Sequence, residues 1–242
     1  MMSPYFSWSL CSTLCPILHE LPPIILDRFL GCEPELDEGI PSEDLVLCAL
    51  SHAVAISLPL DPRFDCDQLF VRFRELVSDH LVSDGISVDN LARSAHSSAI
   101  LERGRRVVLK LLSNFSDLWE RRAVVFPHLR FGLDVETQLR VLNGGLLDSV
   151  VARLDELHEA ARAWPLCKGH EPPWRSEVSR ESESVRNNQA LMSHRKFRDE
   201  IGQPAIFELH AKLGSSIRIH LALDRANFVV EIGYIGTHLP LS

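Results

Sequence analysis

The sequence predicts an α+β protein in which an N-terminal helical domain is followed by a small C-terminal domain made of one helix and an antiparallel β-meander of three or more strands. Apolar residues recur at helical spacing through most of residues 42–164. In residues 207–213 and 217–223 they instead alternate with polar residues, which is the period of a strand with one buried face. These two periodicities place the helices first and the sheet last.

Composition indicates a globular chain with an ordinary charge balance. The 242 residues are 45% hydrophobic, enough to bury a core, and 24% charged, with a formal net charge of −8. This balance argues against wholesale binding to nucleic acid or to a membrane surface, while a local basic patch remains an option. The 6 cysteines include no CxxC pair, so neither a zinc ribbon nor a disulfide scaffold is expected. Free thiols in a reducing cytosol are the expected state.

No targeting or membrane segment is expected at the N-terminus. The apolar run in the first 30 residues lacks a preceding basic region, contains Glu20, and is interrupted by Pro16, Pro22 and Pro23. We therefore expect a cytoplasmic protein that does not associate with a membrane, and we expect no cofactor.

Residues 1–164 are the expected helical domain. Residues 1–40 are expected to form an irregular arm, and residues 42–58 a helix that is buried on most sides. A second helix is expected to begin after Asp65 and to end near the turn at residues 83–85. The apolar residues at helical spacing that predict it are Leu69, Phe70, Phe73, Leu76 and Val77.

Further helical segments complete this domain. They are expected over residues 87–113, 116–125 and 146–164, with a short helix capped by Asp134 between the last two. The first of them carries a cationic cluster, which we interpret as a solvated face paired with nearby acids rather than as a phosphate site. The cluster consists of Arg103, Arg105, Arg106 and Lys110.

Proline, glycine and serine are frequent in residues 165–183, which is typical of a linker between domains. Charge supports a boundary in this region, because residues 1–170 have a net charge of −8 whereas residues 171–242 are neutral. The second domain is therefore expected to span residues 184–242. It is expected to begin with a basic helix over residues 185–200.

The polar face of the terminal sheet is the candidate site. A three-residue loop pairs Leu213 with Ile217, which places Lys212 opposite Arg218 and His210 opposite His220. A four-residue loop then pairs Leu223 with Phe228, which places Glu231 opposite His220 and Gly233 opposite Arg218. The expected result is one row of imidazole and carboxylate groups beside one row of cations.

These rows suggest phosphate binding and proton transfer. Two cations that face each other across a sheet are unfavourable unless an anion lies nearby, so Lys212 and Arg218 are candidate phosphate ligands, together with Arg195 and Lys196 of the preceding helix. His210, His220 and Glu231 are candidate catalytic groups, and we expect Glu231 to orient His220 and to raise its pKa.

Two alternatives stay open for the same residues. Glu208 and Glu231 can simply neutralise the cations and histidines on a solvated sheet face. Alternatively His210, His220 and Glu231 form a set of metal ligands on adjacent strands, since two histidines and a carboxylate suit zinc or iron.

The segment after the third strand adds two candidates. Gly233 and Gly236 flank Tyr234, which indicates tight packing or a bend. We expect the Tyr234 ring to lie in the core with its hydroxyl at the rim, because its parity matches that of Ile232. His238 is expected to be a further catalytic residue of the site.

Two resemblances are carried by these C-terminal residues. The residues ESES at 181–184, followed by HRKF, FELHAKL, RIHL and IGYIGTHLP, resemble an uncharacterised bacterial domain found in small cytoplasmic proteins. A helix followed by a strand meander with IRIHLAL and a terminal IGYIGTH is, more remotely, similar to the RelE/ParE-type toxin fold. The second resemblance implies that Arg218 binds phosphate and that Tyr234 or His238 is the terminal catalytic group.

The chain departs from that toxin family in lacking a basic surplus and in carrying a long acidic helical part. The expected function is a bacterial toxin or phage-defence-type protein whose C-terminal sheet binds nucleic acid, with RNA cleavage by general acid–base chemistry as a possible reaction. The acidic part would then act as a built-in antitoxin or as a docking surface. The alternative is a non-catalytic interaction subunit, bound to a protein partner in a larger assembly.

Overall fold

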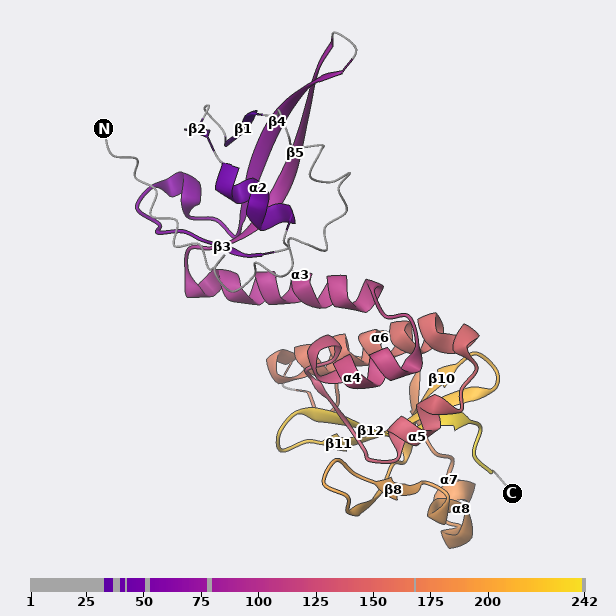
Figure 1. Cartoon of the computed structure of the whole chain (residues 1–242). Helices are drawn as coiled ribbons and strands as arrows, with labels where there is room; N and C mark the ends of the chain where they lie inside the picture. The colour runs from indigo at the N-terminus through magenta and orange to yellow at the C-terminus, as the bar shows by residue number, and fades with distance from the viewer. Residues whose placement is uncertain are drawn as a thin grey trace. The chain divides into compact units, whose positions relative to one another are not determined.

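The computed structural model describes residues 33–36, 40–41, 43–50, 53–77, 80–167 and 169–240. The chain forms two compact units, Met1–Gly104 and Arg105–Ser242, and the boundary between them falls inside helix α3 (Ser97–Lys110). Each unit combines helices with antiparallel strands, so the predicted α+β class is confirmed (Figure 1). Most of the expected N-terminal arm lies outside the described residues.

The first unit is built on a sheet with the strand order β2-β1-β4-β5-β3. Its elements are β1 (Glu33–Leu36), β2 (Ile40–Pro41), α2 (Glu43–Leu50), β3 (Ala55–Ile56), β4 (Gln68–Val77), β5 (His80–Leu91) and the short 3₁₀ helices η3 (Pro62–Phe64) and η4 (Ser94–His96). Helix α2 packs against β5 and β1. The small core contains Leu36, Val46, Ala55, Leu69, Val71 and Val88.

The predicted helix after Asp65 is wrong, because this region is the β4–β5 hairpin. The apolar residues of β4 fit both a helical spacing and an alternating one. The structure follows the alternation: Leu69 and Val71 are buried, whereas Phe70 between them is 49% exposed. The predicted helix over residues 42–58 is shorter than expected, since α2 ends at Leu50 and Ala55 already belongs to β3.

Two arginines of α3 pair with acids, as the sequence indicated, although Arg105 is buried rather than on a solvated face. Arg103 lies 2.8 Å from Asp67 and 2.6 Å from Asp89 within the first unit. Arg105 lies 2.5 Å from Asp155 and 3.2 Å from Glu159 within the second unit. These contacts match the interpretation as paired cations rather than a phosphate site.

The second unit contains the candidate site. Its helices are α4 (Phe115–Val125), α5 (Val135–Arg140), η5 (Gly144–Leu146), α6 (Leu147–Cys167), α7 (Glu183–Arg186) and α8 (Gln189–Ser193). Its main sheet has the order β6-β12-β11-β10-β7 and is formed by β6 (Leu129–Phe131), β7 (Val178–Arg180), β10 (Leu209–Leu213), β11 (Ile217–Asp224) and β12 (Val229–Thr237). A separate pair consists of β8 (Lys196–Arg198) and β9 (Pro204–Ile206).

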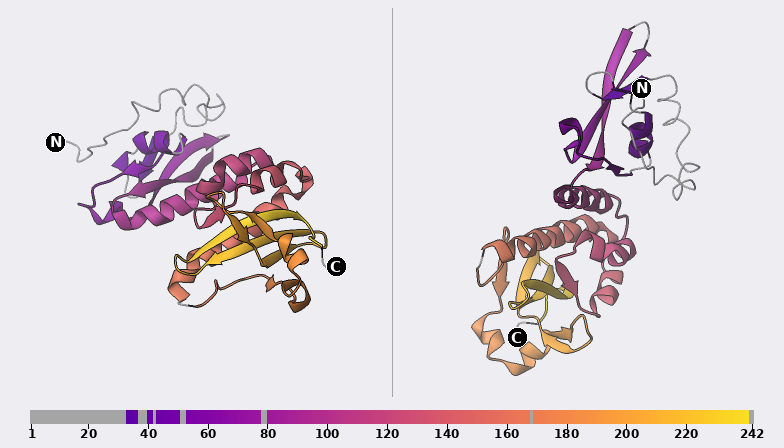
Figure 2. Two further views of the ribbon diagram at one scale, coloured as in Figure 1. Left: turned by 90° about the horizontal axis from the view of Figure 1, so that it is seen from below. Right: turned by 90° about the vertical axis from the view of Figure 1, so that its left-hand side faces the viewer.

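Helices α4, α5 and α6 lie on one face of β10–β12, and α7, α8 and β8 lie on the other (Figures 1 and 2). The helical face contains the core, in which Leu154 and Trp164 of α6 are buried together with Ile219 and Leu221 of β11. Burying side chains of this size is the main favourable contribution to folding. No helix among the described residues is long and apolar enough to cross a membrane.

Two expectations for residues 165–200 need correction. The expected linker at 165–183 lies inside the second unit, and its residues 178–180 form the edge strand β7, which pairs with β10. The expected basic helix over 185–200 is divided into α7, α8 and β8. Asn188 causes the division, since its side chain accepts hydrogen bonds from the backbone N–H groups of residues 190 and 191 and thereby starts a new helix.

Candidate functional site

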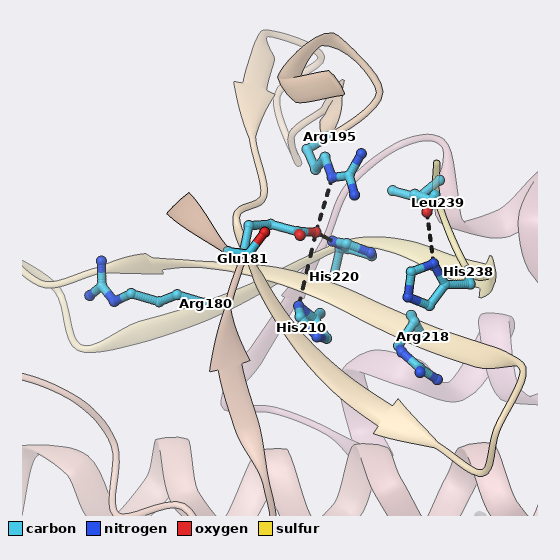
Figure 3. A pocket seen from close by; sticks show the side chains of 9 residues that line it. Arg180, Glu181, Arg195, His210, Arg218, His220, His238 and Leu239 are labelled. Atoms are coloured by element: carbon cyan, nitrogen blue, oxygen red, sulfur yellow. Dashed lines mark hydrogen bonds and ion pairs between the residues drawn. The ribbon is translucent and has the colours of Figure 1, made fainter. Parts of the chain in front are cut away.

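The candidate site is a pocket of about 290 Å³ on the sheet face that carries α7 and α8 (Figure 3). We call it the histidine pocket. Its walls come from β7, β10, β11, the start of β8 and the segment after β12, so segments far apart in the sequence meet here. Its lining residues are Arg180, Glu181, Ser182, Arg195, His210, Arg218, His220, His238 and Leu239.

Strand register places the two central histidines side by side. His210 of β10 pairs with His220 of β11, and Lys212 pairs with Arg218, which confirms the register predicted for this hairpin. The two imidazole rings have centroids 5.6 Å apart. The turn between the strands uses Gly214 at a positive φ of 62°, a conformation that glycine adopts without steric cost.

The predicted register of β12 is wrong, because Leu223 pairs with Val230 rather than with Phe228 and a bulge then follows Ile232. Leu221 pairs with Ile232 but His220 pairs with Tyr234, so Gly233 is an extra residue in the strand. A Cβ atom on Gly233 would lie 2.4 Å from the buried ring of Phe207, which leaves room only for glycine. The bulge turns Tyr234 away from the core and onto the face of the histidines.

The shift of β12, which is present before the bulge, removes Glu231 from the site. It lies opposite Ala222, and its Oε1 accepts a hydrogen bond of 2.6 Å from the backbone N–H of Glu200. Burial raises the pKa of this carboxyl group. Glu231 therefore neither orients His220 nor joins the two histidines as a metal ligand, and no cluster of potential ligands in the described part of the chain is arranged to hold a metal ion.

Glu181 occupies the position that was expected for Glu231. Its Oε1 lies 4.0 Å from Nδ1 of His210 and 3.9 Å from Nδ1 of His220 (Figure 3). The backbone N–H of Glu181 donates to the carbonyl oxygen of Glu208, which extends the pairing of β7 with β10 and fixes the carboxylate above the histidines. No sequence pattern points to Glu181, because it lies in a serine-rich stretch without periodicity.

Arg195 is buried rather than exposed on a basic helix. Its side chain is fully buried, and Nε donates to Oε1 of Glu181 at 2.9 Å. Nη1 donates to the carbonyl oxygens of Leu191 and Pro240. Arg195 thus holds the C-terminal segment against α8. Its neighbour Lys196 is exposed on β8 and does not line the pocket.

Arg218 and Lys212 have different environments although they are neighbours across the sheet. Arg218 is 9% exposed, and Nη1 donates to the carbonyl oxygen of Ile217 at 2.8 Å. Lys212 is exposed, and its Nζ lies 2.7 Å from Oε1 of Glu177. Only Arg218 lines the pocket, and Lys212 is neutralised on the outer surface.

The histidines are expected to be neutral near pH 7. Burial lowers the pKa of His220 to about 4, and it also lowers the pKa of His210. This corrects the expectation that a carboxylate raises the pKa of His220. Nδ1 of His220 donates to the carbonyl oxygen of Phe207 at 3.2 Å, since a carbonyl can only accept, and this contact fixes the tautomer of the ring.

His238 and Tyr234 lie near the rim. His238 is exposed, lines the pocket, and its Nδ1 donates to the carbonyl oxygen of Leu239 at 2.7 Å. Tyr234 is half-buried, its hydroxyl donates to the carbonyl oxygen of Thr237, and its ring stacks on Phe197 with centroids 5.0 Å apart. The Tyr234 ring also lies 5.7 Å from that of His220, and the expectation that it is a core residue is wrong.

The pocket concentrates buried polar atoms that lack partners. In the described part of the chain, five buried side-chain nitrogen or oxygen atoms have no hydrogen-bond partner, and three of them belong to residues of the histidine pocket. These are Nη2 of Arg195, Nδ1 of His210 and Nε of Arg218. Nδ1 of His210 lies 4.0 Å from Glu181, which is too far for a hydrogen bond.

Comparison with known proteins identifies no relative. No protein-family model, no curated protein and no solved structure matches this chain. The chemistry of the histidine pocket is therefore the basis for a functional conclusion.

Proposed function

We propose that the second unit binds RNA, with a phosphate group of the strand in the histidine pocket. The observation that carries this proposal is the set of three buried nitrogen atoms without partners, contributed by Arg195, His210 and Arg218. A buried donor without an acceptor costs about 1–3 kcal/mol, so a ligand that supplies acceptors to all three is bound favourably. The proposal keeps the toxin or phage-defence setting that the RelE/ParE resemblance implies.

Phosphate suits these donors better than a neutral acceptor. Both arginines are permanently charged, and a guanidinium group binds phosphate oxygens with well-defined geometry. Arg195 is neutralised by Glu181, whereas no acidic residue pairs with Arg218 among the ion pairs of the described residues. The pocket therefore retains positive charge in a place that is largely shielded from solvent, where an ionic hydrogen bond is strong.

The rings beside the pocket favour RNA over a free inorganic ion. Phe197 and Tyr234 are stacked and partly exposed, and the Tyr234 ring adjoins His220. Aromatic rings next to a phosphate site are the usual platform for an unpaired base, and stacking contributes about 1–3 kcal/mol per base. A single-stranded segment can place its phosphate in the pocket and a base against these rings.

Cleavage of the strand would require one imidazole to accept a proton and another to donate one. His220 is unsuited to donate, because its pKa of about 4 keeps it neutral at pH 7. His210, whose pKa is also lowered, is the candidate general base, and His238, at the rim of the pocket, is the candidate general acid. In this proposal His210 and His238 catalyse any cleavage, and His220 has a structural role beside them.

The experiment is an RNA-binding titration followed by fluorescence anisotropy, with a gel that reports cleavage of the same strand. We expect Arg218→Gln to weaken binding by about tenfold or more, which corresponds to about 1.4 kcal/mol. The matched control is Arg140→Gln, because Arg140 is an exposed arginine of the same unit that pairs with Glu136. The control removes the same charge and is expected to bind like the wild type.

Two results would overturn the proposal. The first is a wild-type protein that binds no RNA even at low salt, where phosphate contacts are strongest. The second is an equal loss of affinity in Arg218→Gln and Arg140→Gln, which would mean that only the overall charge matters.

A second candidate is the non-catalytic interaction subunit, and the first unit favours it. The residues from 54 to 60 expose apolar side chains in succession, namely Val54, Ile56, Leu58 and Leu60. Exposed apolar groups that are close together mark interaction surfaces. This second function is supported if the purified protein binds no RNA and retains a protein partner in stoichiometric amount.

A further inference from the structure

We infer that the histidine pocket receives a terminal phosphate of the RNA, a phosphomonoester at the end of a strand, rather than an internal phosphodiester. This inference rests on the proposed function and deepens it. It concerns which phosphate is bound, and three features of the pocket carry it: the depth of the donors, their number and the local charge.

The donors lie too deep for a continuous strand. Arg195 is fully buried and Arg218 is 9% exposed, so a phosphate must enter the pocket to reach them. Figure 3 shows the two guanidinium groups on different sides of His220. An internal phosphate is linked to sugars on both sides and needs a groove that is open at two ends. The pocket has a volume of about 290 Å³, which suits one nucleotide end rather than several nucleotides.

The number of donors matches a monoester. A phosphomonoester has three terminal oxygen atoms that accept hydrogen bonds strongly, whereas a diester has two. The pocket offers three donors, Arg195 Nη2, Arg218 Nε and His210 Nδ1. They come from three parts of the chain, namely the residue before β8, strand β11 and strand β10.

The third donor depends on the tautomer of His210. Nε2 of this ring lies 3.5 Å from the hydroxyl group of Ser179, and either atom can donate. When the hydroxyl group donates, Nδ1 carries the proton and lies on the side of the ring that faces Glu181, 4.0 Å from its Oε1. A phosphate oxygen in the pocket selects this tautomer, because it offers Nδ1 an acceptor that the protein lacks.

The local charge fits a single phosphate. Arg180 is neutralised by Glu171 and Glu208, and Arg195 is neutralised by Glu181. Arg218 is then the main source of positive charge inside the pocket. A terminal monoester carries about −1.5 to −2 at neutral pH and is balanced in part by this charge. A triphosphate or a run of backbone phosphates would meet the Glu181 carboxylate with a larger excess of negative charge.

The test compares four single-stranded RNAs of one sequence and about ten nucleotides at about 0.1 M salt. One carries a 5′-phosphate, one carries a 3′-phosphate, one has hydroxyl groups at both ends, and one is a closed circle. We expect one of the phosphorylated strands to bind the full chain at least about tenfold more tightly than the hydroxyl-ended strand, and the circle to bind no better than the latter. Comparison of the 5′-phosphorylated strand with the 3′-phosphorylated strand shows which end is recognised.

A variant of Arg218 tests whether the preference for a phosphorylated end depends on the histidine pocket. Arg218→Lys retains the charge but lacks the Nε donor and the planar fork of arginine. It is expected to reduce the preference for the phosphorylated end to about twofold or less while the hydroxyl-ended strand still binds. Arg140→Lys makes the same chemical change at an exposed position and should leave the preference intact. Thermal unfolding of both variants shows whether they are folded.

The results that would contradict terminal recognition differ from those that would contradict RNA binding. Equal binding of the four RNAs, or cleavage of the circle, would overturn terminal recognition and leave RNA binding in place. Absence of binding to all four would overturn the proposed function as well. A preference that persists unchanged in folded Arg218→Lys would show that the end is recognised elsewhere.

Discussion

Arg195 and Glu181 form an ion pair of 2.9 Å in the wall of the histidine pocket, and both side chains are almost completely buried. The same guanidinium group donates to the carbonyl oxygens of Leu191 in α8 and Pro240 after β12. One buried pair therefore connects the end of β7, helix α8 and the C-terminal segment, and it positions the carboxylate that lies closest to both histidines.

Removal of the Glu181 charge is expected to destabilise the second unit. Glu181→Gln leaves the buried Arg195 without a counter-charge, and breaking a buried pair in this way costs about 3–5 kcal/mol in free energy of unfolding. Urea denaturation followed by tryptophan fluorescence measures the loss. Glu183→Gln is the control, since Glu183 is 86% exposed and its change should stay within about 0.5 kcal/mol. A loss below about 1 kcal/mol in Glu181→Gln would contradict a structural role for the pair.

The bulge in β12 gives a second expectation. In Gly233→Ala the new methyl group meets the Phe207 ring at 2.4 Å, so either the ring or the strand must move. Overpacking of this kind destabilises by about 1–3 kcal/mol. Gly144→Ala is the matched control, because no atom lies within 4 Å of the added carbon. If both variants unfold at the same urea concentration, the bulge does not depend on glycine.

Acid is expected to destabilise the second unit through two buried histidines. Burial lowers the pKa of both His158 and His220 to about 4, whereas the value in the unfolded chain is about 6.5. Between these values the unfolded chain binds more protons, so the free energy of unfolding falls as the pH decreases from about 6.5 to about 4. Each histidine contributes up to about 3 kcal/mol to this fall.

Urea denaturation at neutral pH and at pH values inside that window tests the effect. His220→Gln removes one titrating group and should show a smaller loss of stability on acidification than the wild type. His194→Gln, at an exposed histidine, should show the same loss as the wild type. A pH dependence that is identical in all three proteins would exclude His220 as its source.

The two units are expected to fold separately. Their cores are distinct sets of buried residues, one in each unit, and the residues that line the histidine pocket all belong to the second unit. A fragment of residues 97–242, which keeps α3 whole, should therefore fold cooperatively and bind RNA with the affinity of the full chain. Circular dichroism and the anisotropy titration check both points, and a fragment that does not unfold cooperatively would show that its core is incomplete.

Sequence periodicity predicted the hairpin of the site well and its third strand poorly. The short loop after Leu213 and the alternation on both sides of it permit one register, so the pairing of His210 with His220 followed directly. The bulge at Gly233 depends on the ring of Phe207, which lies in another segment. No local pattern reveals that contact, so the face of Tyr234 is predicted wrongly. The neighbour of Glu231 is wrong for another reason, since the loop before β12 begins one residue later than predicted and Leu223 pairs with Val230.

Other sequence-based predictions were wrong for similar reasons. The apolar residues of β4 satisfy a helical and an alternating period at once, and pairing with β5 decides between them. Glu181 and Arg195 were not connected by the sequence, since 14 positions and two short helices separate them. Tertiary contacts of this kind determine which charges are buried, and they lie beyond what spacing alone can indicate.

The most direct test of phosphate binding is a crystal structure of the protein with a short RNA that carries a terminal phosphate. Phosphate oxygen atoms are expected within about 3 Å of Arg195 Nη2, Arg218 Nε and His210 Nδ1, with the adjacent base near Tyr234. Density for the RNA at another surface, with the histidine pocket occupied by water alone, would contradict it.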